Sequence, residues 1–192
     1  MKIKKVVLTI SLIAAVLGML SCKRADHIVS AAKFITSPYL DLATVEEYAE
    51  IIVIGRKTGD IGEPKDPTVG NPVVHLTEFT ISEIIMDNTG ELQAGDQICL
   101  TEWQMYHEGS GGVWYEHFCG YTNINDKDPY LLFLVAPYEV DGRICYGGEL
   151  NYGQVCLGRK YKMVRYPNSG MTDEYYDCID QVRKEAREKY AR

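Results

Sequence analysis

The sequence predicts a mainly β domain that begins with a short helix and ends with an amphipathic helix. Runs rich in Val, Ile, Thr and aromatic residues alternate with turns of Gly, Asn and Asp, a pattern typical of strands. Residues 130–135 form a continuous apolar run, as in a strand buried on both faces. Residues 172–192 carry apolar positions at helical spacing.

The chain begins with a secretory signal. A basic start, M-K-I-K-K, precedes an apolar run over residues 6–20, which ends at Ser21 and Cys22. A run of roughly 15 residues is short for a membrane span, which needs about 20. A Cys directly after a small residue resembles the bacterial lipoprotein signal. The resemblance implies that residues 1–21 are a lipoprotein signal peptide and that Cys22 is the lipidated N-terminus of the mature chain.

The cleavage site departs from the usual lipobox of Leu, then Ala or Ser, then Gly or Ala, then Cys. Here it reads M-L-S-C, with the large Leu20 one place late. The alternatives are an ordinary signal peptide followed by a chance Cys, or an uncleaved N-terminal anchor. Lipidation by several acyl chains of the palmitate type gives durable anchoring. We expect a membrane-anchored protein of the bacterial cell envelope that faces outside the cytoplasm, with residues 22–40 as a tether.

Charge limits the partners. The formal net charge is −7, and removing residues 1–21 takes away three lysines and no acid, so −7 becomes −10. Such an acidic chain is repelled by phosphates, which excludes nucleic acid as an expected partner. The expected partners are the membrane, through the N-terminal lipid, and an envelope protein or glycan.

The first half of the domain reads as a helix and three strands. Thr44 is an N-cap candidate for a helix to Glu50. The predicted strands are 51–55, 73–86 and 97–107, with a long loop over residues 59–72.

A hairpin follows, turning at the four residues G-S-G-G. Pairing Glu108 with Val113 places His107 opposite Trp114 and puts His107 and His117 on opposite faces, where they cannot share a metal. Exposed aromatic residues mark interfaces or sugar-stacking platforms. The ligand-binding candidates are therefore the residues at the hairpin tip: Tyr106, His107, Trp114 and Tyr115. The alternative is that Trp103 and Trp114 are core residues, which we accept for Trp103.

The second half adds strands 130–135, 143–146 and 153–157 before the final helix. Thr172 caps that helix, whose acids lie in the first turn and whose bases lie in the last turn. An apolar stripe runs along it through Tyr175, Ile179, Val182, Ala186 and Tyr190. Its polar face mixes both charge signs, so it is expected to pack on the domain and not on lipid.

Five cysteines remain when Cys22 is assigned to lipid. Export permits disulfides, and two bridges with one spare thiol are the simplest arrangement, although an anaerobic producer would form none. The pairing stays open among Cys99, Cys119, Cys145, Cys156 and Cys178. Their spacing does not favour a zinc site.

The order of elements resembles a family of small exported bacterial proteins, many of them lipoproteins, with an OB-like, netrin/TIMP-like β-barrel. The resemblance rests on I-I-V-I-G, I-S-E-I-I-M-D, T-G-E-L-Q-A-G-D-Q-I, Y-L-L-F-L and G-G-E-L-N-Y-G, and it covers residues 45–153. It implies a closed or partly open barrel over residues 41–168. The hairpin and the helix at 172–192 lie outside the shared plan, and the helix is expected to pack on the barrel. The family's N-terminal domain Cys is missing, so metalloprotease inhibition does not carry over.

No catalytic constellation, metal site or cofactor site is expected. Ser110 lies in a flexible turn and not in a nucleophile elbow, and His75 is interpreted as a half-buried strand residue. The loop over residues 123–128 is rich in oxygen ligands but lacks the pattern of an EF-hand, so a solvated turn is favoured over calcium. We therefore expect a binding module of unknown ligand. The alternatives are an exported enzyme, a protease-inhibitor-like module with a loop-built site, or a structural envelope protein.

Overall fold

A computed structural model describes six segments of the chain: residues 41–62, 72–109, 112–117, 123–148, 152–158 and 172–191. For residues 72, 73, 103–109 and 112–117 it describes the backbone alone. The expected signal peptide, the lipidation site Cys22 and the tether to residue 40 lie outside the described residues, as does Cys119.

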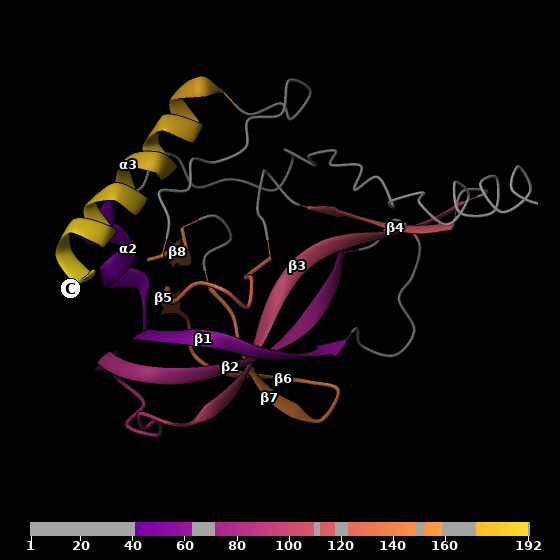
Figure 1. Cartoon of the computed structure of the whole chain (residues 1–192), viewed down its shortest axis with the longest axis horizontal. Coiled ribbons are helices and arrows are strands. Elements are labelled where there is room, and N and C mark those ends of the chain that lie inside the picture. Colours follow the sequence, from indigo (N-terminus) through magenta and orange to yellow (C-terminus); the bar gives the residue numbers. More distant parts are fainter. Residues whose placement is uncertain are drawn as a thin grey trace, which may run out of the picture.

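Eight strands form one mixed sheet (Figure 1). They are β1 (Ile51–Gly62), β2 (Pro72–Asp87), β3 (Gln97–Gly109), β4 (Gly112–His117), β5 (Tyr130–Leu134), β6 (Tyr138–Val140), β7 (Arg143–Tyr146) and β8 (Gln154–Cys156). The order is β6-β7-β3-β2-β1-β5-β8, with β4 also paired to β3. Only β3 and β7 pair in parallel among these strands.

The sheet curves strongly but does not close into a barrel. An isolated bridge between Leu134 and Gly148, and a 2.8 Å hydrogen bond from Val135 N to Gly147 O, join the end of β5 to the segment after β7. No strand ladder continues this contact among the described residues. The mainly β class is confirmed, and the sheet is open where a closed barrel was one expectation.

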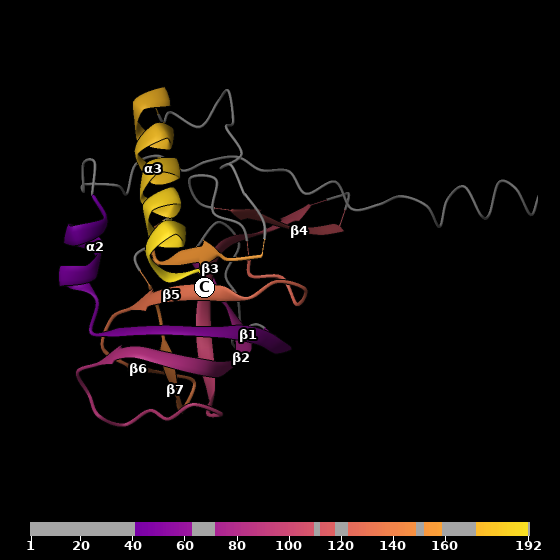
Figure 2. The same cartoon turned by 60° about the vertical axis from the view of Figure 1, so that its left-hand side comes forward.

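Two helices lie together at one end of the sheet (Figures 1 and 2). Helix α2 (Leu42–Tyr48) contacts the C-terminal turn of α3 (Asp173–Tyr190), where Lys189 Nζ lies 2.7 Å from Glu46 Oε2. Thr172 caps α3 as predicted, since its side chain accepts from Tyr175 N. Within the described part of the chain, neither helix has the length and apolar character needed to cross a membrane.

The sheet has a hydrophobic core on each side. The continuous apolar strands contribute to both cores, because successive side chains of a strand point to opposite faces. In β5, Leu131 and Phe133 pack under the helices, whereas Tyr130, Leu132 and Leu134 fill the concave interior. All five residues are buried, which confirms the prediction of a strand covered on both sides. The stripe of α3 supplies Tyr175, Ile179, Val182 and Ala186 to the first core, with Tyr190 partly buried against it.

Three local predictions were wrong. The cap of α2 is Asp41 and not Thr44, because the Asp41 carboxylate accepts from Thr44 N at 2.8 Å. A loop was expected from residue 59, but strand β1 continues to Gly62. It does so because its last residues stay paired with β2, in a ladder that contains four register shifts. The short strand β6 carried no sequence signal, and it forms because it pairs with β7 across a turn.

Candidate functional site

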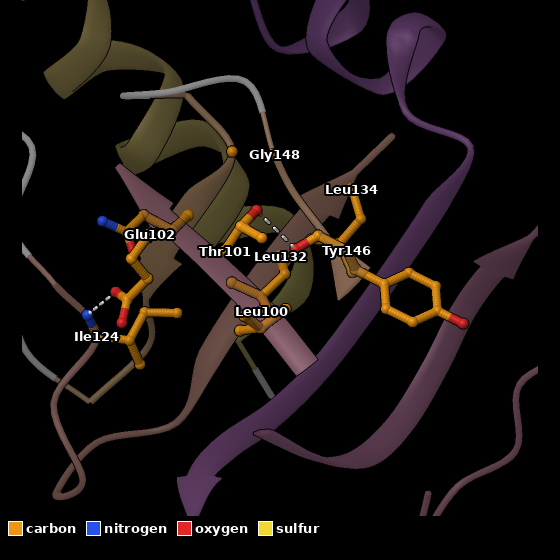
Figure 3. Close-up of a pocket in the computed structure, with 10 residues that line it drawn as sticks. Leu100, Thr101, Glu102, Ile124, Leu132, Leu134, Tyr146 and Gly148 are labelled. Carbon is orange, nitrogen blue, oxygen red and sulfur yellow. Dashed lines mark hydrogen bonds between the residues drawn. The ribbon is translucent and has the colours of Figure 1, made fainter. Parts of the chain in front are cut away.

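The concave side of the sheet encloses a small cavity of about 20 Å³ (Figure 3). Its lining comes from β3, the loop before β5, β5 itself and the segments around β7 and β8: Leu100, Thr101, Glu102, Ile124, Leu132, Leu134, Tyr146, Gly148, Gly153 and Gln154. This volume accommodates about one water molecule. Pockets for organic ligands are roughly 300–1,000 Å³, so the cavity does not fit such a ligand.

Glu102 is the charged residue of this lining and is only 1% exposed. Its carboxyl group accepts a hydrogen bond from Thr77 Oγ1 at 2.5 Å and another from Ile124 N at 2.6 Å, the second of which is drawn in Figure 3. Burial raises the pKa of Glu102 above its ordinary value, although both hydrogen bonds act in the opposite direction. The residue therefore joins β2, β3 and the loop before β5 from inside the fold.

Further polar residues continue from Glu102 along the same part of the sheet. His75 lies directly opposite Glu102 in the β2–β3 register, and Asp60 lies opposite Thr77 in the β1–β2 register. Asp60 Oδ1 is 2.8 Å from His75 Nε2 and 2.5 Å from Lys57 Nζ. We call these five residues, Lys57, Asp60, His75, Thr77 and Glu102, the polar row.

The polar row pairs a carboxylate with an imidazole, as acid–base chemistry requires, while its hydroxyl group, Thr77 Oγ1, donates to Glu102. Burial alone would raise the pKa of Asp60, but hydrogen bonds from His75 and Lys57 hold it below its ordinary value. The side chain of His75 is 18% exposed, which agrees with the expected half-buried strand residue. Among the described residues, the His75 ring hydrogen-bonds to Asp60 and to no hydroxyl or thiol group.

The hairpin predicted from the glycine turn is present, with the predicted register. Strand β4 pairs with β3 so that Glu108 is opposite Val113, His107 opposite Trp114, and Tyr106 opposite Tyr115. The pairing of β2 with β3 ends at Met105, so the ribbon beyond it has two strands among the described residues. We call residues 106–109 and 112–115 the ribbon tip. Figure 1 shows it at the side of the molecule away from the helices.

The oxygen-rich loop over residues 123–128 is a structured turn. Asn125 Oδ1 accepts from Lys127 N at 2.9 Å and from Asp128 N at 3.1 Å, and Asn125 Nδ2 donates to Tyr130 Oη at 2.6 Å. Asp128 is 7% exposed and not solvated as expected, because it packs against Gly158. The described residues contain no cluster of three or more His, Cys, Asp or Glu side chains suited to a metal ion.

Four of the predicted disulfide cysteines are described, and all four are free thiols: Cys99, Cys145, Cys156 and Cys178. Cys99 and Cys145 are directly paired positions of β3 and β7, and their Sγ atoms are 3.1 Å apart. Cys156 belongs to the concave core, whereas Cys178 packs against the core under the helices. These two therefore lie on opposite sides of the sheet.

The polar row, apart from His75, was not predicted from the sequence. One signal was available in the sequence. Every second side chain of a strand points to the same face, so Glu102 lies on the inward face of β3 together with Ile98 and Leu100. The roles of Lys57 and Asp60 had no such signal, because β1 was expected to end before them.

Comparison with known proteins identifies no relative: no family model matches the chain, and a search of curated proteins finds no match.

Proposed function

We propose that this chain is a lipid-anchored binding protein of the bacterial cell envelope, which uses the ribbon tip to contact an envelope glycan. The observation that carries the proposal is the ribbon itself. It extends past the last β2–β3 pair and presents two consecutive cross-strand pairs that hold three aromatic residues and a histidine. A two-stranded ribbon is marginally stable by itself in water, so aromatic residues kept there suit contact with a partner.

Two further observations support a surface site over an internal one. The cavity beside Glu102 holds about one water molecule, which leaves no room for a sugar. Among the described residues no hydroxyl or thiol group hydrogen-bonds to His75, which favours a surface site over hydrolysis at that position. The acidic charge of the chain supports a neutral glycan over a nucleic acid.

We also propose that the domain follows the OB-like plan. The bridge from Leu134 to Gly148 brings the end of β5 against the segment after β7, which is where closure of such a barrel would occur. OB-like domains bind ligands on one sheet face and through adjacent loops. A ribbon that extends from β3 is consistent with that use, and it supports the binding interpretation over a purely structural role.

The test of binding is calorimetric titration of the full chain, extracted in mild detergent, with soluble oligosaccharides of β-linked N-acetylglucosamine. We expect Trp114→Ala to weaken binding about tenfold or more, as for a central aromatic contact. Tyr48→Ala is the matched control, because Tyr48 is an aromatic residue, 62% exposed, that belongs to α2, and Figure 1 shows α2 at the other side of the molecule from the ribbon. Equal affinities for the two variants, or no heat with any oligosaccharide, would contradict the proposal. Turnover of the probe would favour the enzyme alternative.

The test of the anchor is metabolic labelling with a palmitate analogue in the producing bacterium. The proposal expects the label on the wild-type chain and its loss in Cys22→Ser. Mass spectrometry should show a mature chain that begins at Cys22 and carries a diacylglyceryl group and an amide-linked acyl group. An unlabelled chain that keeps residues 1–21 would indicate an uncleaved anchor instead.

A further inference from the structure

We infer that Cys99 and Cys145 are a disulfide-forming pair that joins β7 covalently to β3. The two residues are directly opposite in a parallel register, and their Sγ atoms are 3.1 Å apart, inside the nonbonded contact distance of two sulfurs. Neighbouring strands are about 4.7–4.9 Å apart, which falls within the Cα separation of about 4.4–6.8 Å found in disulfides. The backbone therefore needs no rearrangement to permit the bond.

The pair lies on the convex face of the sheet. Leu100 and Tyr146, the next residues of β3 and β7, belong to the concave core, so the two thiols point to the other side. Cys145 is fully buried, whereas Cys99 is partly exposed. An external oxidant therefore reaches Cys99 first.

The oxidation proceeds by thiol–disulfide exchange with a small-molecule or protein disulfide. The Cys99 thiolate attacks one sulfur of the oxidant, which releases one thiolate and leaves a mixed disulfide. The Cys145 thiolate then attacks Cys99 Sγ, which forms the Cys99–Cys145 bond and releases the second thiolate of the oxidant. Two protein thiols lose two electrons, the oxidant disulfide gains them, and the two protons pass to the released thiolates. An envelope location, which is part of the proposed function, supplies such an oxidising compartment.

Reduced Cys99 is a poor nucleophile, which favours a structural bond over a catalytic one. Burial, and then the neighbouring Cys145 thiol, raise the pKa of Cys99 to about 12, so little thiolate is present at neutral pH. Exchange is therefore slow in both directions. The role that fits is a lasting bond between the two strands.

The position of the pair indicates what the bond would stabilise. Strand β7 pairs with β3 at two positions, Cys99 with Cys145 and Leu100 with Tyr146, and β6 is joined to the sheet through β7. The edge hairpin β6–β7 thus depends on a short parallel contact. The bond would also close a loop that spans 46 positions and contains the whole β3–β4 ribbon.

The experiment uses the purified full chain, reduced and then incubated with glutathione disulfide, so it does not depend on where the protein resides. After alkylation and proteolysis, mass spectrometry should find one peptide pair joined through Cys99 and Cys145, and thiol titration should show two fewer thiols per chain. Cys99→Ser should abolish the cross-link, and Cys178→Ser is the matched control that should retain it. An unchanged thiol count, or a bond from either residue to Cys119 or Cys156, overturns the inference.

Urea unfolding tests the structural role of the bond. The oxidised wild type should unfold at a higher urea concentration than the reduced wild type, and Cys99→Ser should show no such shift. Cys145→Ala provides a second variant. Alanine is chosen over serine because Cys145 is fully buried, and a serine hydroxyl group there would be removed from water and would destabilise the fold. An oxidised protein that unfolds at the same or a lower urea concentration contradicts the structural role. Failure of the glycan titration with a confirmed Cys99–Cys145 bond would reject the proposed function and leave this inference intact.

Discussion

Thr77 Oγ1 donates a 2.5 Å hydrogen bond to Glu102 Oε2 inside the curved sheet, where Thr77 is fully buried and Glu102 is 1% exposed. The bond connects β2 to β3 at the edge of the cavity. Ile124 N donates to the other carboxyl oxygen at 2.6 Å, which attaches the loop before β5. One buried acid therefore joins three segments, and its protonation affects the stability of the fold.

Replacing Glu102 by Gln should change how stability depends on pH. The raised pKa means that the folded state binds a proton more readily than the unfolded chain, whose pKa is near 4.5. The contribution of Glu102 is therefore present below about pH 4.5 and is lost as pH rises through the higher folded pKa. Denaturant unfolding from pH 4 to 8 should show that Glu102→Gln gains stability relative to wild type as pH rises. A constant difference would contradict the raised pKa.

Replacing Glu102 by Leu should be strongly destabilising. The change leaves the Thr77 hydroxyl and the Ile124 N–H without their acceptor in the interior, at about 1–3 kcal/mol for each group. Urea unfolding measures the loss, and Glu102→Gln is the control of similar shape. The prediction fails if Leu is tolerated as well as Gln.

Asp87 should stabilise the turn after β2 in a pH-dependent way. Its carboxylate accepts from Thr89 N, Thr89 Oγ1 and Leu92 N at 2.9, 2.6 and 2.9 Å. Burial opposes ionisation, but these hydrogen bonds hold the pKa of Asp87 below its ordinary 3.8. We expect Asp87→Ala to cost about 1–2 kcal/mol at pH 7. Since the pKa is lowered, this contribution is present above pH 3.8 and lost as pH falls through the folded pKa, which acid unfolding of both proteins should reveal.

Gly55→Ala should destabilise the sheet. A Cβ at this position of β1 would collide with the backbone carbonyl oxygen of Thr80 and with the ring of Phe79, which is fully buried. Such overpacking typically costs about 1–3 kcal/mol. Gly59→Ala on the same strand is the matched control, because its added Cβ meets the flexible end of the Glu78 side chain. In thermal unfolding, Gly55→Ala should have a clearly lower Tm than Gly59→Ala, and the reverse order of Tm would refute the packing argument.

Ile179→Ala should loosen α3 from the sheet. Ile179 is fully buried in the core under the helices, so the truncation leaves a cavity at a cost of about 2–5 kcal/mol. Lys184→Ala on the exposed side of α3 should change the free energy of unfolding by less than about 0.5 kcal/mol. Hydrogen exchange provides a second measurement, in which the amides of α3 should lose protection in Ile179→Ala alone.

Several elements were predictable because their signals are local. The apolar run at 130–134 and the Thr172 cap each describe neighbouring residues, and both predictions are confirmed. The β3–β4 register was predictable because the glycine turn fixes which residues face each other. The end of β1 was not predictable, since its last residues have no apolar run and are held by pairing with β2.

The sequence by itself determined the β class, the two helices and the hairpin register, because periodicity and turn residues act over a few positions. Tertiary structure alone decided which distant residues meet. It buried Glu102 against Thr77, placed Lys189 beside Glu46 across 143 positions, and brought Cys145 to Cys99. The physical reason is that these contacts depend on strand order and sheet curvature, which the packing of two cores sets for the whole chain.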